Sequence, residues 1–513
     1  MKRIVSLLMA LLLITSILTG CQNVPVGDGQ TTPRDDTVVT AELDTKQETE
    51  ARDTLWIVME EHEAMELLVD TIIDKFEQIH SDVEIELEVL PNGNKRGNEY
   101  KAARDAVLQR IRSAIMSGKG PDVFLLPSTT TTYEMLFEDV NLAMRNYLFA
   151  DISEYYDADT ELGKEELLGG VMDAGVVDGA RYILPLRYDM PVAYVDVAQF
   201  EAQSGSLDMF DGGIMELYKD LLATGNSELI AGAFVSSHAM EQLAMNFCGE
   251  VINYDECEVQ LTAEELAEFM STVQTVRDHE YVAPENWMQR AAVNSPPTLV
   301  GLFGTMEHWT DSTSMYIGRM QDLLDNAAYA KTQDVEIAMI PLASANGKVT
   351  ADVTYFGAVG GNCKVPAVAY EFLRLFLTED GQWLENKDTA DEGYYLGWPV
   401  RVKGDVSLLW QLRKGRLATF TNIEDPEWNE EIKLLRQEYV SEILTGTTVI
   451  DVEDLPILDV AVNRAQLSID LEKVLDSILI ELNDSTTCEA IPADIDAMAA
   501  QWIDDLEWHL AEG

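Results

Sequence analysis

The sequence is poor in positive charge. It contains 35 Lys and Arg residues against 91 Asp and Glu residues, which gives a formal net charge of -56 at pH 7. So acidic a surface repels the phosphates of nucleic acids and the headgroups of anionic lipids. We therefore expect no nucleic-acid partner. The negative charge favours solubility, but by itself it indicates no function.

The sequence also lacks the common catalytic and cofactor-binding motifs. It has only six histidines, and the His62-Glu63 step has no second histidine one turn later, as a zinc hydrolase would need. It has no G-x-S-x-G nucleophile motif, no complete phosphate-binding loop and no dinucleotide-binding glycine pattern. We therefore predict no catalytic residues, no metal site and no cofactor. Because acidic pairs are common at this composition, a glycan-active enzyme with two catalytic carboxylates remains a minor alternative.

Cysteines are few. Beyond Cys21 there are four, at Cys248, Cys257, Cys363 and Cys488, and no two of them have the spacing of a zinc site. Cys248 and Cys257 are near neighbours, so a hairpin through the polar turn between them would allow a disulfide. Two unpaired, buried cysteines are the interpretation that we favour, although the sequence does not decide between the two.

No apolar run reaches the length of a membrane-spanning helix. Lys2 and Arg3 precede an apolar run of 15 residues over 4–18, whereas a spanning helix needs about 20. This pattern is typical of a secretory signal. Residues 18–21, LTGC, resemble the bacterial lipobox, which implies cleavage before Cys21 and attachment of diacylglycerol and palmitate to this cysteine. An ordinary signal peptide followed by an unrelated cysteine is the alternative.

Residues 21–53 are predicted to form a disordered tether. Phe, Trp and Tyr are absent from 22–53, and Pro, Gly, Thr and acidic residues dominate. With 1–20 removed as the signal peptide, Cys21 would anchor the mature chain in the cell membrane on its outer, extracytoplasmic face. The folded part is expected to begin near Thr54, and its length is more than one core usually contains. Two domains are therefore expected.

The first part of this region alternates between strand and helix patterns. Strands are predicted over 55–58, 83–89 and 123–126, and helices over 65–79 and 103–114. The strand over 83–89 alternates apolar residues with glutamates, which predicts one buried and one solvated face. Strand and helix in alternation predict right-handed crossovers and a largely parallel sheet.

The second of these helices has a predicted apolar stripe of Ala103, Val107, Ile111 and Ala114, and Gly118 is expected to end it in a left-handed conformation. Further helices are predicted over 266–276, 372–376 and 495–510. In a parallel sheet, ligands bind beyond the carboxyl ends of the strands. These ends are expected at 59–63 and 127–132.

The order of segments resembles that of family 1 extracellular solute-binding proteins of ABC importers. The resemblance runs from Thr54 nearly to the C-terminus. It is carried by the following segments in the family's order: TLWIV, DKFEQIHSDVEIELEV, RIRSAIMSGKGPDVFLL, RYILPLRYDMPVAYVD, NYDECEVQLTAEELAEF, VGLFGTMEHW, EIAMIPLASANGK, YFGAVGGN, AVAYEFLRLFLTEDGQ and GYYLGWPVR.

This resemblance implies an α/β fold of the periplasmic-binding-protein-like type II, with two discontinuous lobes joined by a three-segment hinge. The first lobe would comprise 54–188 and 358–400, and the second 190–355 and 402–513. The hinge segments would be 185–191, 354–361 and 397–402. The glycines in the second and third segments, at 357, 360, 361 and 397, could absorb the dihedral change of lobe closure.

The resemblance implies a binding function without chemistry. We expect the chain to capture an extracellular sugar or oligosaccharide and to deliver it, as a monomer, to the permease subunits of an ABC transporter. A polyamine or another cationic solute is the alternative ligand, since carboxylates and aromatic rings would also bind it. A sensory or adhesive lipoprotein without a transporter is a further alternative.

Sugar sites combine aromatic rings with carboxylates and other polar groups. In the second lobe, the resemblance makes Trp309 a stacking residue, with Glu307 as its companion. Tyr395 and Trp398 lie near the third hinge segment. In the first hinge segment, Tyr188 and Asp189 stand in an apolar run, where a carboxylate is costly unless it is paired or bound to a ligand.

After the first strand, Glu61 is the candidate, beside Glu60 and His62. After the third strand, Ser128 and Thr129 are the candidates. Arg187 is the alternative, internal partner of Asp189. Asp122 is assigned to the fold, because it stands at the beginning of its strand.

Overall fold

The computed structural model describes residues 53–93, 98–128, 133–226, 229, 251–253, 256, 258–280, 314–319, 326, 335–344, 346–382, 397–401, 465 and 495–512. They belong to one compact unit, Arg52–Gly513. Several predicted residues lie outside the described part: Cys21, Thr129, Cys248, Cys257, Glu307, Trp309, Tyr395 and Cys488. Within the described part, no helix is long and apolar enough to cross a membrane.

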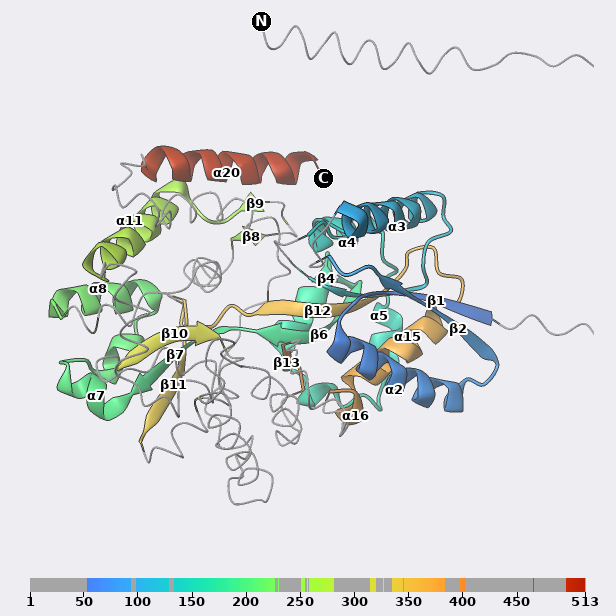
Figure 1. Cartoon of the computed structure of the whole chain (residues 1–513), viewed down its shortest axis with the longest axis horizontal. Helices are drawn as coiled ribbons and strands as arrows, with labels where there is room; N and C mark the ends of the chain where they lie inside the picture. Colours follow the sequence, from blue (N-terminus) through green and yellow to red (C-terminus); the bar gives the residue numbers. More distant parts are fainter. Residues whose placement is uncertain are drawn as a thin grey trace, which may run out of the picture. The chain divides into compact units, whose positions relative to one another are not determined.

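A six-stranded mixed sheet forms the larger part of the structure (Figure 1). Its strands, in the order of the sheet, are β13 (Trp398–Pro399), β6 (Ile183–Asp189), β12 (Asp352–Val359), β3 (Val123–Pro127), β1 (Asp53–Glu60) and β2 (Val83–Leu90). The predicted α/β class is confirmed.

The prediction of a largely parallel sheet holds for only two of the five strand pairings. β1 pairs in parallel with both β2 and β3, whereas β12 is antiparallel to β3 and to β6, and β13 is antiparallel to β6. The difference has a topological reason. β12 and β13 are not linked to their neighbours by the crossover helices that impose a parallel direction, because the chain reaches them after passing through other structure.

Two long helices follow β1 and β2, as predicted: α2 (Glu63–Ile79) and α3 (Asn98–Met116). The stripe predicted for α3 is partly wrong. Ile111 is buried, but Ala103 is exposed, and Arg104 and Leu108 are buried in its place. The predicted left-handed Gly118 is confirmed, with φ of 71°.

The alternation predicted for β2 is confirmed only in its first half. Val83 is buried and Glu84 exposed, but Val89 is 38% exposed and Leu90 is fully buried. Val83 and Val89 share one face of the strand and Leu90 lies on the other, so the buried face of β2 changes at its carboxyl end.

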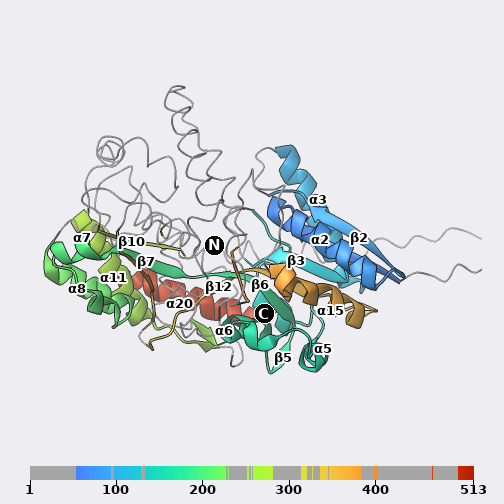
Figure 2. The ribbon, with the colours of Figure 1, turned by 90° about the horizontal axis from the view of Figure 1, so that it is seen from below.

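Smaller elements complete this part of the fold. They are α4 (Val140–Arg145), α5 (Ser153–Ala158), α6 (Gly169–Met172), β4 (Val176–Val177), β5 (Ala180–Arg181), α15 (Pro366–Arg374), the 3-10 helix η5 (Leu375–Leu377) and α16 (Glu379–Gln382). The helical pattern predicted near 372–376 therefore spans α15 and η5. Figure 2 shows α15 beside α2, where the Phe372 and Phe76 rings meet edge to face at 5.4 Å.

A second, three-stranded antiparallel sheet has the order β10 (Met315–Arg319), β7 (Pro191–Asp196), β11 (Ile337–Pro341). Its helices are α7 (Val197–Ala202), α8 (Ile214–Thr224), α11 (Ala263–Glu280) and α20 (Ile495–Glu512), and β8 (Ile252–Asn253) pairs with β9 (Glu258–Val259). The helices predicted over 266–276 and 495–510 are confirmed. One set of residues of this sheet, which includes Ala193 and Val195, contributes to a second hydrophobic core. Val192, Tyr194 and Ile337 belong to the core of the six-stranded sheet.

The chain passes from one sheet to the other through a single residue, Met190, between β6 and β7 (Figure 1). All of β12 lies in the six-stranded sheet, from Asp352 onward. The predicted hinge segment 354–361 is therefore inside this sheet or directly after it. The glycines of this segment allow close packing: a Cβ on Gly360 would lie 2.1 Å from the Pro121 carbonyl oxygen, and one on Gly361 2.4 Å from that of Tyr147. The bounds of the two lobes themselves stay a prediction.

Candidate functional site

Most of the described candidate residues lie at the end of the six-stranded sheet where β1, β3 and β6 terminate. β1, β3 and β6 run in the same direction, so their carboxyl ends meet at this edge, where β12 and β13 begin. We call this the polar edge. Along it lie, in the order of the sheet, Trp398, Tyr188, Asp189, Asp352, Ser128, Glu60 and Glu61.

Two carboxylates stand opposite each other at the polar edge. Asp189 pairs with Asp352 in the β6–β12 ladder, and their residues are only 1% and 6% exposed. Asp189 Oδ1 accepts a hydrogen bond from the Met190 backbone N–H at 2.9 Å, so this carboxylate binds the residue that links the two sheets. Like charges directly opposite on neighbouring strands destabilise a sheet, and buried charges require compensation. Arg187 is the internal partner that the sequence suggests for Asp189. Its guanidinium group donates to the carbonyls of Leu186, Gly381 and Gln382.

The aromatic candidates at this edge, Tyr188 and Trp398, belong to the hydrophobic core. Tyr188 pairs with Trp398 on one side and with Val353 on the other, and both Tyr188 and Trp398 are buried. Burial raises the pKa of the Tyr188 hydroxyl, and the nearby Asp189 carboxylate raises it further. A role of either ring in ligand binding stays a prediction.

Ser128 connects two strands of the edge. Its side chain is buried, its hydroxyl donates to the Val353 carbonyl, and its backbone N–H donates to the Thr354 carbonyl at 3.2 Å. These bonds hold the end of β3 against the start of β12. The Ser128 hydroxyl is thus already engaged by the protein backbone.

At the end of β1, the buried carboxylate of Glu60 forms a bidentate ion pair with Arg104 of α3. The Arg104 guanidinium nitrogens lie 2.5 and 3.1 Å from the two carboxylate oxygens, and both residues are almost completely buried. Burial raises the pKa of Glu60, and Arg104 opposes this rise. Arg104 also donates to the carbonyls of Pro91 and Glu134, so it holds the loops after β2 and β3.

The two residues after Glu60 are also held by the protein. Glu61 Oε2 accepts the Asn92 backbone N–H at 2.8 Å. His62 precedes α2, and burial lowers the pKa of its imidazole to about 4, so the ring is neutral at physiological pH. Through its bond to Asn92, Glu61 holds the loop that follows β2.

Tyr133 is a candidate that sequence reasoning missed. It is half-buried in the loop after β3, and the Arg104 guanidinium carbon lies 4.3 Å from the centre of its ring. Gly93 lies against the same ring, where an added Cβ would come within 2.0 Å of the ring carbon Cγ. The signal in the sequence is that Tyr133 is the first aromatic residue after the four threonines 129–132.

The assignment of Asp122 to the fold is confirmed. Its carboxylate accepts the Trp56 backbone N–H at 3.0 Å, and its own backbone bonds to Trp56 and Gly360. Cys363 beside it is a free, half-buried thiol whose pKa is raised to about 12 by burial. Among the residues that the structure describes, no three His, Cys, Asp or Glu side chains are grouped so that they could hold a metal ion.

Comparison with known proteins gives similarity at the level of structure alone. No family model matches the sequence, and no curated protein matches it. In fold, the chain is similar to solved extracellular solute-binding proteins. One is a family 1 protein from Alicyclobacillus acidocaldarius, with a TM-score of 0.48 and 13% identity over 89% of this chain and 98% of the other.

Two further solved structures are similar to this chain to the same degree. An ABC substrate-binding protein from Listeria monocytogenes in complex with cycloalternan aligns with a TM-score of 0.45 and 13% identity, over 90% of this chain and 98% of the other. A cyclic alpha-maltosyl-1,6-maltose binding protein from Arthrobacter globiformis aligns with a TM-score of 0.49 and 13% identity, over 90% and 99%.

Proposed function

We propose that this protein binds an extracellular solute between two lobes and releases it, chemically unchanged, to the permease of an ABC transporter. The observation that carries the proposal is the position of Asp189. This residue ends β6 at the polar edge and bonds to Met190, which leads directly into the second sheet. A solute held here would contact the segment that joins the two sheets, and its binding would favour one arrangement of them.

The solute is a neutral mono- or oligosaccharide. Both oxygens of Glu60 are bonded to Arg104, and Glu61 accepts a backbone N–H, so the carboxylates after β1 are already engaged. A cationic solute would have to displace these bonds. A half-buried tyrosine ring and buried hydrogen-bonding groups suit sugar rings and hydroxyls.

A cationic solute such as a polyamine is the second candidate. The observation in its favour is the facing pair of Asp189 and Asp352, because two carboxylates on neighbouring strands are groups to which an ammonium can donate charged hydrogen bonds. The two candidates differ in how strongly the affinity depends on this pair. A sugar would use a carboxylate as a hydrogen-bond acceptor, whereas a polyamine would lose a full charge interaction when either aspartate is neutralised.

A thermal-shift screen of the purified chain 21–513 against neutral oligosaccharides and polyamines tests the proposal. A ligand at one hundred times its dissociation constant stabilises the native state by about 2.7 kcal/mol. Stabilisation by a sugar supports the first candidate, and stabilisation by a polyamine supports the second. Hydrolysis of a stabilising sugar would replace both with the enzyme alternative.

The variants Asp189→Asn and Asp352→Asn then separate the candidates. For a sugar, we expect Asp189→Asn to weaken binding about tenfold, as the loss of a charged hydrogen bond does. For a polyamine, we expect each variant to weaken binding about a hundredfold. Asp220→Asn, at an exposed position on α8, is the matched control. Small-angle scattering should show a smaller radius of gyration on saturation, and an unchanged radius would contradict lobe closure.

We further propose that Cys21 anchors the protein in the membrane. The basis is the LTGC segment after the apolar run of residues 4–18. Cys21→Ser should release the chain from the membrane fraction of cells. Full retention of this variant in the membrane would overturn the lipoprotein interpretation.

A further inference from the structure

The chain re-enters the six-stranded sheet at β13, a strand of only two residues. Trp398 pairs with Tyr188 and Pro399 with Arg187. Proline has no backbone N–H, so it cannot donate to the ladder. In an antiparallel ladder the next pair would be Val400 and Leu186, but the ladder between the two strands ends at Pro399. β13 thus pairs with β6 over only two residues. Beyond them, backbone pairing of this segment is with Leu167 and Leu168, outside the six-stranded sheet.

The side chain of Gln382 occupies the position of the next ladder bond. Its Oε1 accepts the Val400 N–H at 2.7 Å, and its Nε2 donates to the Leu186 carbonyl at 3.3 Å. A side-chain amide has one acceptor and one donor group, as a peptide group has. It therefore links the two strands at the point where their own peptide groups are no longer paired.

The same amide makes two further bonds. Nε2 donates to the Phe376 carbonyl at 2.6 Å, and Oε1 lies 3.4 Å from the Arg401 N–H. The Gln382 residue is 2% exposed, and its backbone N–H donates to the Thr378 carbonyl. Every hydrogen-bonding atom of the amide is engaged at a buried position, where each unmade bond is costly.

We infer that Gln382 is a positioning residue that substitutes for a backbone pair and fixes Trp398–Arg401 to the six-stranded sheet. This segment coincides with most of the predicted third hinge segment, 397–402. With these four residues fixed, bending during lobe closure would have to occur outside them. This last consequence rests on the proposed function, whereas the role of Gln382 in the sheet does not.

The inference is tested by amide hydrogen exchange at Val400 and Arg401 in the full mature chain without solute. Gln382→Met keeps the approximate volume but removes all four bonds. We expect exchange at Val400 to become about tenfold faster, as the loss of one hydrogen bond predicts. Gln109→Met, at an exposed position on α3, should leave exchange at Val400 unchanged. Unchanged protection of Val400 in Gln382→Met would overturn the inference.

Gln382→Glu provides a test that a merely space-filling role would not pass. An ionised carboxylate still accepts the Val400 N–H but faces the Leu186 and Phe376 carbonyls without a donor. A protonated carboxyl regains one donor. The folded state should therefore raise the pKa of the new carboxyl, so its destabilisation grows as pH rises above the unfolded value of about 4.3.

We expect the melting temperature of Gln382→Glu to lie several degrees below the parent at pH 8 and to approach it at pH 5. The neighbouring Arg187, Arg401 and Glu166 are the same in both proteins, so the pH-dependent difference between them reports the new carboxyl. Gln109→Glu is the matched control. A pH-independent difference would overturn the inference. Because neither measurement uses a solute, a failed solute screen would leave this result intact.

Discussion

The two hydrophobic cores of the molecule differ in how deeply the ion pairs beside them are buried. The core of the six-stranded sheet is bordered by three ion pairs with at least one largely buried partner: Glu60 with Arg104, Asp159 with Arg374 and Glu166 with Arg401. In the described part of the other core, the ion pairs are those of Lys219 with Glu216 and Glu268, on exposed faces of α8 and α11. The first core thus depends on specific arginines, and the second on apolar packing.

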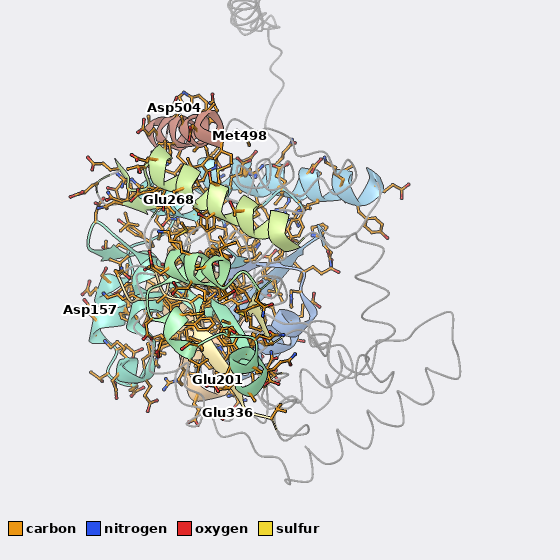
Figure 3. The ribbon with its side chains drawn as sticks, turned by 90° about the vertical axis from the view of Figure 1, so that its left-hand side faces the viewer. Asp157, Glu201, Glu268, Glu336, Met498 and Asp504 are labelled. Carbon is orange, nitrogen blue, oxygen red and sulfur yellow. The ribbon has the colours of Figure 1, made fainter. Side chains whose placement is uncertain are left out.

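The difference follows from what each core must hold in place. Around the six-stranded sheet, arginine side chains donate hydrogen bonds to the backbone carbonyls of the connecting segments. Arg401 donates to Leu162 and Leu377. Arg104 donates to Pro91 and Glu134. The second core is covered by helices with regular apolar stripes. Figure 3 labels Glu268 on α11 and Asp504 on α20, two of the acidic residues on their solvated faces.

Arg104→Met should be the most damaging change in the first core. It leaves the Glu60 carboxylate buried without its partner, so we expect a loss of about 3–5 kcal/mol in the free energy of unfolding. Urea unfolding measures this loss. Arg110→Met removes the ion pair between the half-exposed Arg110 and Glu88 and should cost less than about 1 kcal/mol. Equal losses would contradict the special role of the buried arginine.

Leu506→Ala tests the apolar packing of the second core. Leu506 is buried on α20, and its truncation should cost about 3 kcal/mol through lost burial and a cavity. Trp508→Ala, two residues later, removes a side chain that is 63% exposed and should change stability by less than about 0.5 kcal/mol. If Trp508 mattered more than Leu506, the exposed face of α20 would have a partner.

His62 should make the first core sensitive to acid. Its folded-state pKa of about 4 lies below the ordinary value of 6.5, so the unfolded chain binds the proton more tightly. Stability should therefore fall as pH decreases from about 7 to 4, by up to about 3 kcal/mol, and level off below that range. His62→Gln should remove this part of the pH dependence. The difference between the two urea-unfolding curves across pH isolates the contribution, and parallel curves would contradict it.

Tyr133→Ala should weaken solute binding by about 2 kcal/mol, roughly thirtyfold, as central aromatic truncations do. Trp309→Ala is predicted to have a similar effect from the second lobe, although Trp309 lies outside the described residues. Isothermal titration with the solute found by screening measures both. Tyr147→Ala truncates an exposed tyrosine away from the polar edge and serves as the control. An unchanged dissociation constant in Tyr133→Ala would remove this ring from the site.

Lys219→Met should have the smallest effect. Its two carboxylate partners are about half exposed, so solvent and salt screen the attraction, and we expect a loss below about 1 kcal/mol. Arg374→Met, whose partner Asp159 is largely buried, should cost more. Unfolding at low and high salt should separate them, because only the exposed pair weakens strongly with salt.

Much of the local structure could be predicted from the sequence. α2, α11 and α20 follow their apolar periodicity, and Gly118 ends α3 in the predicted left-handed conformation. The parallel strands β1, β2 and β3 follow from the alternation of strand and helix. The buried face of α3 could not be predicted in the same way. Arg104 lies on this face, and an arginine is expected to face solvent unless its buried partner, here Glu60, is known.

The sequence by itself determined the apolar faces of α2, α11 and α20, the first parallel strands, the acidic composition and the segments in which polar residues follow strand ends. These depend on neighbours within a few turns of chain. The tertiary structure decided the antiparallel half of the sheet, the Glu60–Arg104 pair, the facing Asp189 and Asp352, and the insertion of Gln382 between β6 and Val400. Each joins residues far apart in the chain. Local propensities do not choose between such partners, because the free energy of a buried polar group is set by which distant donor or acceptor reaches it when the sheet is complete.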